Sequence, residues 1–347
     1  MSVKETVLET LSSNRGTYIS GEELSASLGV SRAAVWKAIN ALREEGFNIE
    51  AVTNKGYRLS AERQSITEES FRYALPQEYR RSSGRSFCKS FVYDSLDSTN
   101  LEAKRLLLDG KASSGCVVIA NRQTAGRGRL GRSFFSPESG LYLSIIIKPD
   151  FDISKSVLVT VAAAAAVAKS IEEVCSQDAR IKWVNDIYID SSKVCGILTE
   201  AMTDFESGQI DNLVIGIGVN TSLEGFPEEL KKTAGAVDLD RAASLGNVPG
   251  KTNAISLLAS RITCYTLAYT AQIGKASPEF LDIYRNKSLV LGREIKVFKG
   301  AYRSDPNSEL GGVAAKALGI DDDGGLQVIY TSGERETLTT GEVTIRL

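Results

Sequence analysis

The chain has 347 residues, enough for two or three domains that each bury a core. Its 41 basic and 43 acidic side chains nearly balance, so no global charge attracts nucleic acid or a membrane, and any such contact must be local. The absence of histidine excludes Ser-His-Asp hydrolysis and histidine-based zinc or acid-base catalysis, and it favours chemistry that relies on arginine, lysine and Mg²⁺.

Five cysteines occur without a C-x-x-C pair, which argues against a disulfide framework or a structural zinc site and predicts reduced, mostly buried thiols. The longest apolar run, residues 157–168, contains one threonine and is shorter than the ~20 residues that span a bilayer. It predicts a buried alanine-rich helix. No charged segment followed by an apolar stretch opens the sequence, so we expect a cytoplasmic protein without a membrane segment.

Residues 1–63 have the pattern of a winged helix-turn-helix. After an opening helix, Ser20 and Ser31 are placed to cap two helices that are joined by a turn at Gly29. A β-hairpin wing follows over residues 48–59. Basic side chains on the second helix of the pair and on the wing suit DNA, although a winged helix used only for protein contact is an alternative. The candidate DNA contacts are Ser31, Arg32, Ala33, Trp36, Lys37, Asn40 and Lys55.

Three glycines and three arginines within residues 126–132 predict an anion-binding loop, because glycine lets backbone approach a ligand and guanidinium groups bind phosphate or carboxylate bidentately. The segment also satisfies G-x-G-x-x-G, but a dinucleotide-binding motif needs a following helix, and a strand is expected at 141–147 instead. A solvated basic loop is the remaining alternative. We favour a loop between two strands that folds over a phosphate-bearing ligand.

Three other segments have the character of a ligand site. Residues 98–100 stand at the start of an expected helix, where a capping box of Thr99 and Glu102 would be the purely structural explanation. Lys182 and Lys193 begin the two strands of an expected strand pair and could neutralise a phosphate or simply be exposed. The strand expected over residues 213–220 has glycines on one face, and such gaps often admit a ligand or another backbone.

Residues 287–347 contain short strands joined by glycine turns, which predicts a small barrel. Within them, residues 321–324 hint at a calcium loop, but the spacing is wrong and the twelfth position, Ser332, is not a glutamate. We therefore expect a hairpin turn there.

Seven motifs follow one another along the chain: Ser31-Arg32-Ala33-Ala34-Val35, Lys55-Gly56-Tyr57, Asp97-Ser98-Thr99-Asn100, Gln123-x-x-Gly126-Arg127-Gly128-Arg129-x-Gly131-Arg132, Lys182-Trp183-x-Asn185-Asp186, Lys193-x-x-Gly196-Ile197-Leu198 and Gly216-x-Gly218-x-Asn220. This ordered set resembles the bifunctional biotin protein ligases that also act as biotin operon repressors, over essentially the full length. Two positions depart from the family: Val184 replaces a usual proline, and Phe134 often corresponds to a tryptophan. Phe134 keeps an aromatic face for an adenine.

The resemblance implies an α+β multidomain protein with a winged helix-turn-helix over 1–63 and a connector over 64–90. It further implies a mixed-sheet α/β biotin/lipoate-ligase-type catalytic domain over 91–286 and an SH3-like β-barrel over 287–347. The implied chemistry is the formation of biotinyl-5′-adenylate from biotin and ATP with Mg²⁺, and transfer of biotin to a lysine of a biotin carboxyl carrier protein. The liganded protein would bind the biotin operator as a homodimer.

The resemblance also implies site residues. It makes Lys193 and Arg129 catalytic and Asp186 a Mg²⁺ ligand. The implied biotin contacts are Ser98, Thr99, Asn100, Gln123, Arg127, Gly128, Arg129 and Lys193. The implied adenylate contacts are Arg129, Arg132, Phe134, Lys182, Asn185, Asn220 and Arg346.

Two other functions stay open. A lipoate-type ligase would share the catalytic architecture but would lack the winged helix and the side chains expected to bind a ureido ring. The chain could also be a metabolite-sensing repressor without catalysis, but such a protein would not need arginine and lysine at all the expected anion-binding positions.

Overall fold

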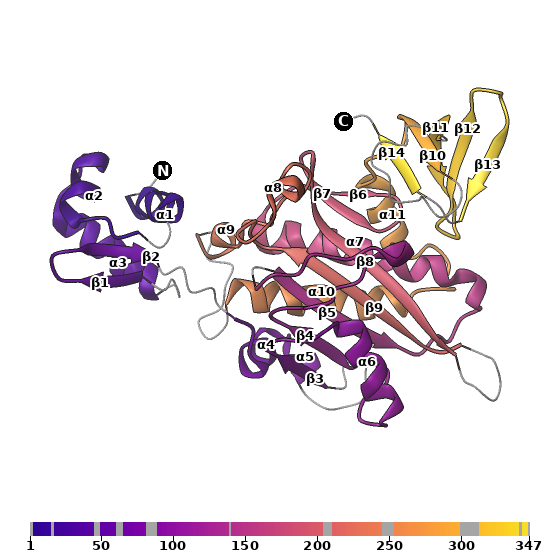
Figure 1. Ribbon diagram of the computed structural model, residues 1–347, viewed down its shortest axis with the longest axis horizontal. Helices are drawn as coiled ribbons and strands as arrows, with labels where there is room; N and C mark the ends of the chain where they lie inside the picture. The colour runs from indigo at the N-terminus through magenta and orange to yellow at the C-terminus, as the bar shows by residue number, and fades with distance from the viewer. Residues whose placement is uncertain are drawn as a thin grey trace.

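The computed structural model describes residues 3–14, 17–44, 49–59, 65–80, 89–138, 140–203, 210–244, 253–298, 312–339 and 342–345. Over these ranges the chain forms an N-terminal helix-turn-helix, a central mixed sheet with helices, and a C-terminal antiparallel sheet (Figure 1). Among the described residues, no helix combines the length and apolarity that crossing a membrane requires.

The N-terminal part has the predicted helix-turn-helix and hairpin. Its elements are α1 (Val3–Ser13), α2 (Gly21–Leu28), α3 (Arg32–Glu44), β1 (Ile49–Val52) and β2 (Gly56–Leu59). Ser20 Oγ accepts a hydrogen bond from the Glu23 N–H at 3.0 Å, and Ser31 Oγ accepts one from the Ala34 N–H at 3.2 Å, so both serines act as N-caps. A separate apolar core, which includes Leu11 and Ile39, holds the three helices together.

The central sheet has seven strands in the order β3-β4-β5-β9-β8-β7-β6. They are β3 (Ser90–Tyr93), β4 (Val117–Ala120), β5 (Gly140–Ile147), β6 (Ala179–Lys182), β7 (Asp186–Ile189), β8 (Ser192–Thr203) and β9 (Ile210–Asn220). Of the strand pairs described in this sheet, only β3–β4 is parallel. This confirms the mixed sheet.

Helices cover both faces of this sheet because side chains alternate along each strand. Val117 and Ile119 of β4 pack in the core with α7 (Ser156–Cys175) and α10 (Ala254–Thr270). Val118, between them, packs on the other face against α6 (Thr99–Leu108). The remaining helical segments are α4 (Glu68–Ala74), α5 (Gln77–Arg80), η1 (Arg129–Gly131), η2 (Ile153–Lys155), α8 (Glu228–Lys231), α9 (Leu239–Ser244) and α11 (Glu279–Asn286).

The C-terminal part is a five-stranded antiparallel sheet in the order β13-β12-β11-β10-β14. Its strands are β10 (Glu294–Phe298), β11 (Val313–Ile320), β12 (Leu326–Tyr330), β13 (Arg335–Leu338) and β14 (Glu342–Ile345). In the described part of the chain, β13 and β14 are edge strands that do not pair with each other, so a closed barrel is not confirmed. Glycine turns predict hairpins between neighbouring strands, but they do not determine whether the two edge strands of the sheet pair and close a barrel.

One structural alternative and one prediction from the sequence were wrong. The helix α6 begins at Thr99 with Ser98 as N-cap, and the Glu102 carboxylate accepts a hydrogen bond from the Tyr93 hydroxyl at 3.1 Å instead of closing a capping box. Lys182 ends a short strand rather than beginning a long one, because the chain turns back after it and pairs Lys182 with Asp186.

Two other predictions were confirmed. The alanine-rich run lies in α7, where residues 161–168 are fully buried. Cys116, Cys175, Cys195 and Cys264 are free and buried, whereas Cys88 lies outside the described residues.

The close packing of α7 predicts intolerance to larger side chains. Ala165 is fully buried, so we expect Ala165→Leu to lower the free energy of unfolding by about 1–3 kcal/mol or more, because the added atoms have no space. The same change at the exposed Ala201 of β8 should alter stability by less than about 0.5 kcal/mol. Urea unfolding of both variants measures this, and equal stabilities would contradict the close packing of α7.

Candidate functional site

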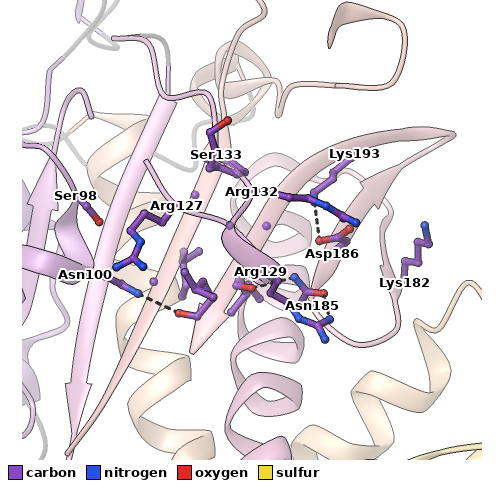
Figure 2. A pocket seen from close by; sticks show the side chains of 18 of the residues that line it. Ser98, Asn100, Arg127, Arg129, Arg132, Ser133, Lys182, Asn185, Asp186 and Lys193 are labelled. Carbon is purple, nitrogen blue, oxygen red and sulfur yellow. Dashed lines mark hydrogen bonds and ion pairs between the residues drawn. The ribbon is translucent and has the colours of Figure 1, made fainter. Parts of the chain in front are cut away.

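A cavity of about 540 Å³ lies over β8 and β9, beneath the loop that follows β4 (Figure 2). Its wall comes from the start of α6, the glycine- and arginine-rich loop, the turn between β6 and β7, and the C-terminal sheet. The lining residues are Ser98, Thr99, Asn100, Gln123, Arg127, Gly128, Arg129, Arg132, Ser133, Phe134, Lys182, Trp183, Asn185, Asp186, Lys193, Gly196, Ile197, Leu198, Gly216, Ile217, Gly218, Phe298 and Val343. Motifs far apart in the sequence therefore share one cavity.

The glycine- and arginine-rich loop is folded on itself. The Gly128 N–H donates to Arg132 O at 2.7 Å, and the Phe134 N–H donates to Gly126 O at 2.8 Å. These bonds hold the loop as a compact flap between two strands, as predicted. Arg129 Nη1 donates to Asn185 Oδ1 at 3.0 Å, which ties the flap to the turn between β6 and β7 (Figure 2).

The glycines of β8 and β9 make room for side chains of the site itself. A Cβ atom at Gly216 would lie 2.3 Å from Asn100 Oδ1, and one at Gly218 would lie 2.5 Å from Phe134 Cε1. A Cβ at Gly196 would also crowd the Phe134 ring. The gaps are present, but the side chains of Asn100 and Phe134 occupy them, instead of the ligand or second backbone that the sequence led us to expect.

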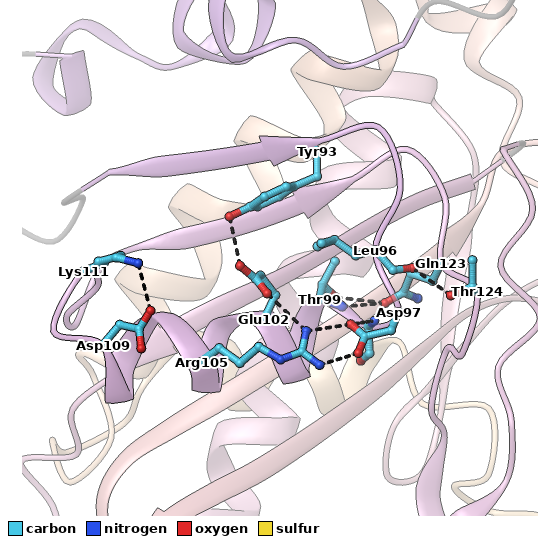
Figure 3. A network of polar contacts seen from close by, with 11 residues as sticks. Tyr93, Leu96, Asp97, Thr99, Glu102, Arg105, Asp109, Lys111, Gln123 and Thr124 are labelled. Carbon is cyan, nitrogen blue, oxygen red and sulfur yellow. Dashed lines mark hydrogen bonds and ion pairs between the residues drawn. The ribbon is translucent and has the colours of Figure 1, made fainter.

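One end of the cavity is polar and uncharged. Gln123 Oε1 accepts hydrogen bonds from the Thr99 N–H at 2.8 Å and from the Thr99 hydroxyl at 3.2 Å (Figure 3). Gln123 Nε2 donates to Ser136 Oγ at 3.0 Å. The Ser98 hydroxyl makes no capping bond to α6 and lines the cavity. The start of α6 thus presents small polar groups in fixed positions.

Asn100 has its amide hydrogens directed at the protein. Its Nδ2 donates to Glu200 Oε2 at 2.7 Å and to Leu198 O at 3.3 Å, while the Ser144 hydroxyl donates to its Oδ1 at 2.6 Å. Since an amide group has two hydrogens, Asn100 fastens α6 to the sheet rather than offering a spare donor. Sequence reasoning missed both Glu200 and Ser144.

Glu200 joins this polar end to the flap. Its carboxylate accepts a hydrogen bond from Lys104 Nζ at 2.9 Å and lies 3.7 Å from Arg127 Nη1. Burial favours the neutral acid, but the hydrogen bonds from Lys104 and Asn100 outweigh it, so the pKa of the Glu200 carboxyl is lowered from its ordinary value. Glu200 is therefore a carboxylate near neutral pH.

The other end of the cavity contains an ion pair. Lys193 Nζ lies 2.7 Å from Asp186 Oδ1 across the β7–β8 strand pair (Figure 2). Among the described residues, Asp186 is the one carboxylate in the cavity lining, and no cluster of three metal-ligating side chains occurs. A single carboxylate fits Mg²⁺ only together with substrate phosphates, which is the usual way that proteins hold this ion. The residues present therefore fit a Mg²⁺ ion that arrives with a nucleotide.

Two of the expected adenylate residues are not in the cavity wall as described. Asn220 is buried beside it, and its Nδ2 donates to Gly235 O at 3.1 Å and to Lys193 O at 3.4 Å, so it supports the strand that carries Lys193. Arg346 lies outside the described residues. The departure at Val184 leaves Asn185 and Asp186 at the cavity, with a cis peptide bond between Trp183 and Val184.

The expected DNA contacts gather on one helix and the wing. Trp36 is 60% exposed on α3, which is unusual for so large an apolar side chain. Arg32 forms an ion pair with Glu22 of α2. The exposed candidates are Ser31, Arg32, Ala33, Trp36, Lys37 and Lys55, and Asn40 is half-buried.

Comparison with known proteins gives matches along both main segments. The Biotin/lipoate A/B protein ligase family model matches residues 92–220, and an HTH domain model matches residues 3–58. The bifunctional ligase/repressor BirA of Bacillus subtilis is 32% identical over 335 residues, 95% of each chain. BirA of Escherichia coli is 33% identical over 218 residues, which cover 62% of this chain and 63% of the relative.

A solved structure gives a consistent match. The biotin protein ligase from Aquifex aeolicus in complex with biotin and ATP is similar with a TM-score of 0.58 and 27% identity. The match covers 75% of this chain and 99% of that one.

The Glu200 cluster predicts a pH-dependent stability. Because the pKa of Glu200 is lowered in the folded protein, its charge stabilises the fold above the ordinary glutamate pKa, and this contribution is lost as pH falls through the folded pKa. We expect Glu200→Gln to unfold more easily at pH 7 by about 1–3 kcal/mol, with a smaller difference from the wild type below pH ~4. Urea unfolding at both pH values measures this.

Glu228→Gln is the matched control, because Glu228 forms an exposed ion pair with Lys231 and such pairs contribute little. A difference between Glu200→Gln and the wild type that is equal at both pH values would contradict a charge effect.

Proposed function

Since the chain belongs to the family of bifunctional biotin ligase/repressor proteins, we propose that it activates biotin with ATP to biotinyl-5′-adenylate and transfers the biotin to a lysine of a biotin carboxyl carrier protein. The same protein represses biotin genes by binding operator DNA. The observation that supports the ligase function best is the two-ended cavity, polar and uncharged at α6 and cationic at the flap and β8.

The cavity suits a ligand with a neutral head and a phosphate. Ser98, Thr99 and Gln123 present hydroxyl and amide groups that match the N–H and C=O groups of a ureido ring. Gly128 and Arg127 of the flap are further biotin contacts, and the Arg127 guanidinium belongs to the cationic side of the cavity. Phe134, packed over the glycines of the sheet, offers an aromatic surface to the rest of the ligand.

Activation requires the biotin carboxylate to attack the α-phosphate of ATP, so two anions must approach each other. Arg127, Arg129, Arg132 and Lys193 offset this repulsion, and Lys182 and Asn185, which also line the cavity, contact the nucleotide. Lys193 pairs with Asp186, and we propose that it exchanges this carboxylate for the phosphate of the ligand. Mg²⁺, held by the phosphates with Asp186, would neutralise charge on the pyrophosphate.

Transfer needs no nucleophile from the protein. The adenylate is a mixed anhydride, and the amine of the acceptor lysine attacks its carbonyl carbon and releases AMP. The flap over the cavity, tied by Arg129 to Asn185, keeps water from the anhydride until the acceptor arrives. This division of roles agrees with a sequence that has no histidine.

Biotin-dependent exchange of pyrophosphate into ATP by the purified protein tests the proposal. Exchange with biotin but not with lipoate supports it. Exchange with lipoate alone would indicate a lipoate-type ligase, and no exchange with either acid would indicate a ligand-sensing repressor without catalysis.

The regulatory half of the proposal concerns residues 1–63, a homodimer and the operator. We propose that α3 enters the major groove with Trp36 and Lys37 near the bases, and that Lys55 of the wing contacts the backbone. We also propose that residues 91–286 are the catalytic domain, joined to 1–63 by a connector, and that the C-terminal sheet over 287–347 belongs to an SH3-like module with Arg346 near the nucleotide. The protein would act in the cytoplasm.

Lys193 gives the sharpest test of the charge argument. Lys193→Ala should lower pyrophosphate exchange by on the order of 100-fold or more with the fold intact, because it removes a cation from a pocket that must hold two anions. Lys148→Ala is the matched control, since Lys148 forms an exposed ion pair with Asp211. Exchange by Lys193→Ala at the rate of the control would contradict the role of Lys193.

The operator function predicts linkage between ligand and DNA. A winged helix with few basic residues should bind one half-site weakly, and two copies on a dimer should bind more tightly through effective concentration. We expect biotin plus ATP to promote dimerisation and tighten operator binding, and deletion of residues 1–63 to abolish DNA binding but spare adenylate synthesis. Sedimentation and operator titrations measure this. A ligand-insensitive monomer with unchanged DNA affinity would contradict it.

A further inference from the structure

Trp183 connects the cavity to the C-terminal sheet. Its side chain is 3% exposed, and its indole N–H donates to Gly324 O at 3.1 Å, although the two residues are 141 positions apart. In the sequence, Trp183 stands between Lys182 and Asn185, and all three line the cavity. The hydrogen bond therefore links a residue of the cavity wall, Trp183, to a turn that does not line the cavity.

The turn that accepts this bond is firmly built. Asp321 Oδ1 accepts hydrogen bonds from the N–H groups of Asp323 at 3.0 Å and Gly325 at 2.7 Å. Gly324 has a φ of +81°, and a Cβ atom there would lie 3.0 Å from Val161 Cγ2 of α7. The turn between β11 and β12 is thus pressed onto α7, and only glycine fits at its tip.

A second contact holds the same turn on α11. Arg285 Nε donates to Ile320 O at 3.0 Å, and Arg285 Nη2 donates to Asp322 Oδ1 at 2.8 Å. The residues that suggested a calcium loop in the sequence therefore form a docking turn whose carbonyl group is aimed at Trp183.

The turn at residues 183–185 is held from three sides. The Tyr284 hydroxyl of α11 donates to Val184 O at 3.2 Å, and Asn185 Nδ2 donates to Ile197 O of β8 at 3.0 Å. Trp183 supplies the third contact, the one to the C-terminal sheet. Asn185 also accepts a hydrogen bond from Arg129 of the flap. A displacement of residues 183–185 would therefore move the side chains of both Asn185 and Arg129 at the cationic end.

We propose that Trp183 is a positioning residue for the cationic end of the cavity, which binds the nucleotide. Through the hydrogen bond from Trp183 to Gly324, this end keeps its shape only while the C-terminal sheet is docked. The polar end rests instead on α6, β5 and the segment after β4. Loss of this hydrogen bond should therefore weaken the binding of ATP and leave the binding of biotin unchanged. This inference rests on the proposed function, because it assumes that the cationic end takes the nucleotide.

The test is Trp183→Phe, which keeps an aromatic ring and removes only the indole donor. We expect KM for ATP in pyrophosphate exchange to rise by about tenfold with KM for biotin unchanged, because a buried carbonyl loses its partner and the turn relaxes. Tyr330→Phe is the matched control: it removes an aromatic hydroxyl that donates to Glu336 inside the same sheet, away from Trp183.

A second variant perturbs the same contact from the other side. Gly324→Ala should push the turn away from α7 and raise KM for ATP in the same way, and the double variant should be no worse than the more impaired single variant, since both changes break one contact. The nucleotide affinity of each variant can be measured without turnover by titration with an ATP analogue. The analogue has a methylene group between its α- and β-phosphates and therefore cannot react.

The outcomes are distinguishable. A selective loss of ATP affinity in Trp183→Phe, absent from Tyr330→Phe, supports the inference. A fall in kcat alone, an equal rise in both KM values, or multiplicative effects in the double variant would overturn it. A wild-type protein that binds the analogue but shows no biotin-dependent exchange would refute the proposed function, and the analogue titration would still decide the role of Trp183.

Discussion

The repulsion between two anions is the physical constraint on which this cavity depends. The cations that we propose to offset it have carboxylate partners of their own: Lys193 lies 2.7 Å from Asp186, and Arg127 lies 3.7 Å from Glu200. Removing one member of such a pair in a half-buried site leaves an uncompensated charge. A phosphate-bearing ligand can replace the carboxylate as the partner of Lys193, so the ion pair holds the lysine ready without closing the cavity to a nucleotide.

The fold makes this arrangement possible by anchoring the flap and the start of α6. The flap depends on its own backbone hydrogen bonds and on the contact of Arg129 with Asn185, while Asn100 fixes the start of α6 over the gap at Gly216. The neutral and cationic ends therefore rest on different supports. α6 and β5 hold the first, and the turn between β6 and β7, with the C-terminal sheet behind it, holds the second.

Much of the fold was predictable because its signals are local. Ser20 and Ser31 mark helix starts through hydrogen bonds within three residues, and the alanine-rich run predicts a buried helix by composition. Ser144 and Glu200 gave no such signal, since each is an ordinary strand residue whose partner, Asn100, is at least 44 positions away. Pairing between the edge strands of the C-terminal sheet is equally non-local, so the turn residues could not predict whether the sheet closes into a barrel.

The position of the phosphate in a complex with a stable biotinyl-5′-adenylate analogue tests the account most directly. A crystal structure of that complex should show the ureido ring at Ser98 and Gln123. Lys193 should have moved from Asp186 to within hydrogen-bonding distance of the phosphate, with Arg129 on its other side. A phosphate bound outside the cavity, or a Lys193 still paired with Asp186 while the analogue is bound, would contradict the account.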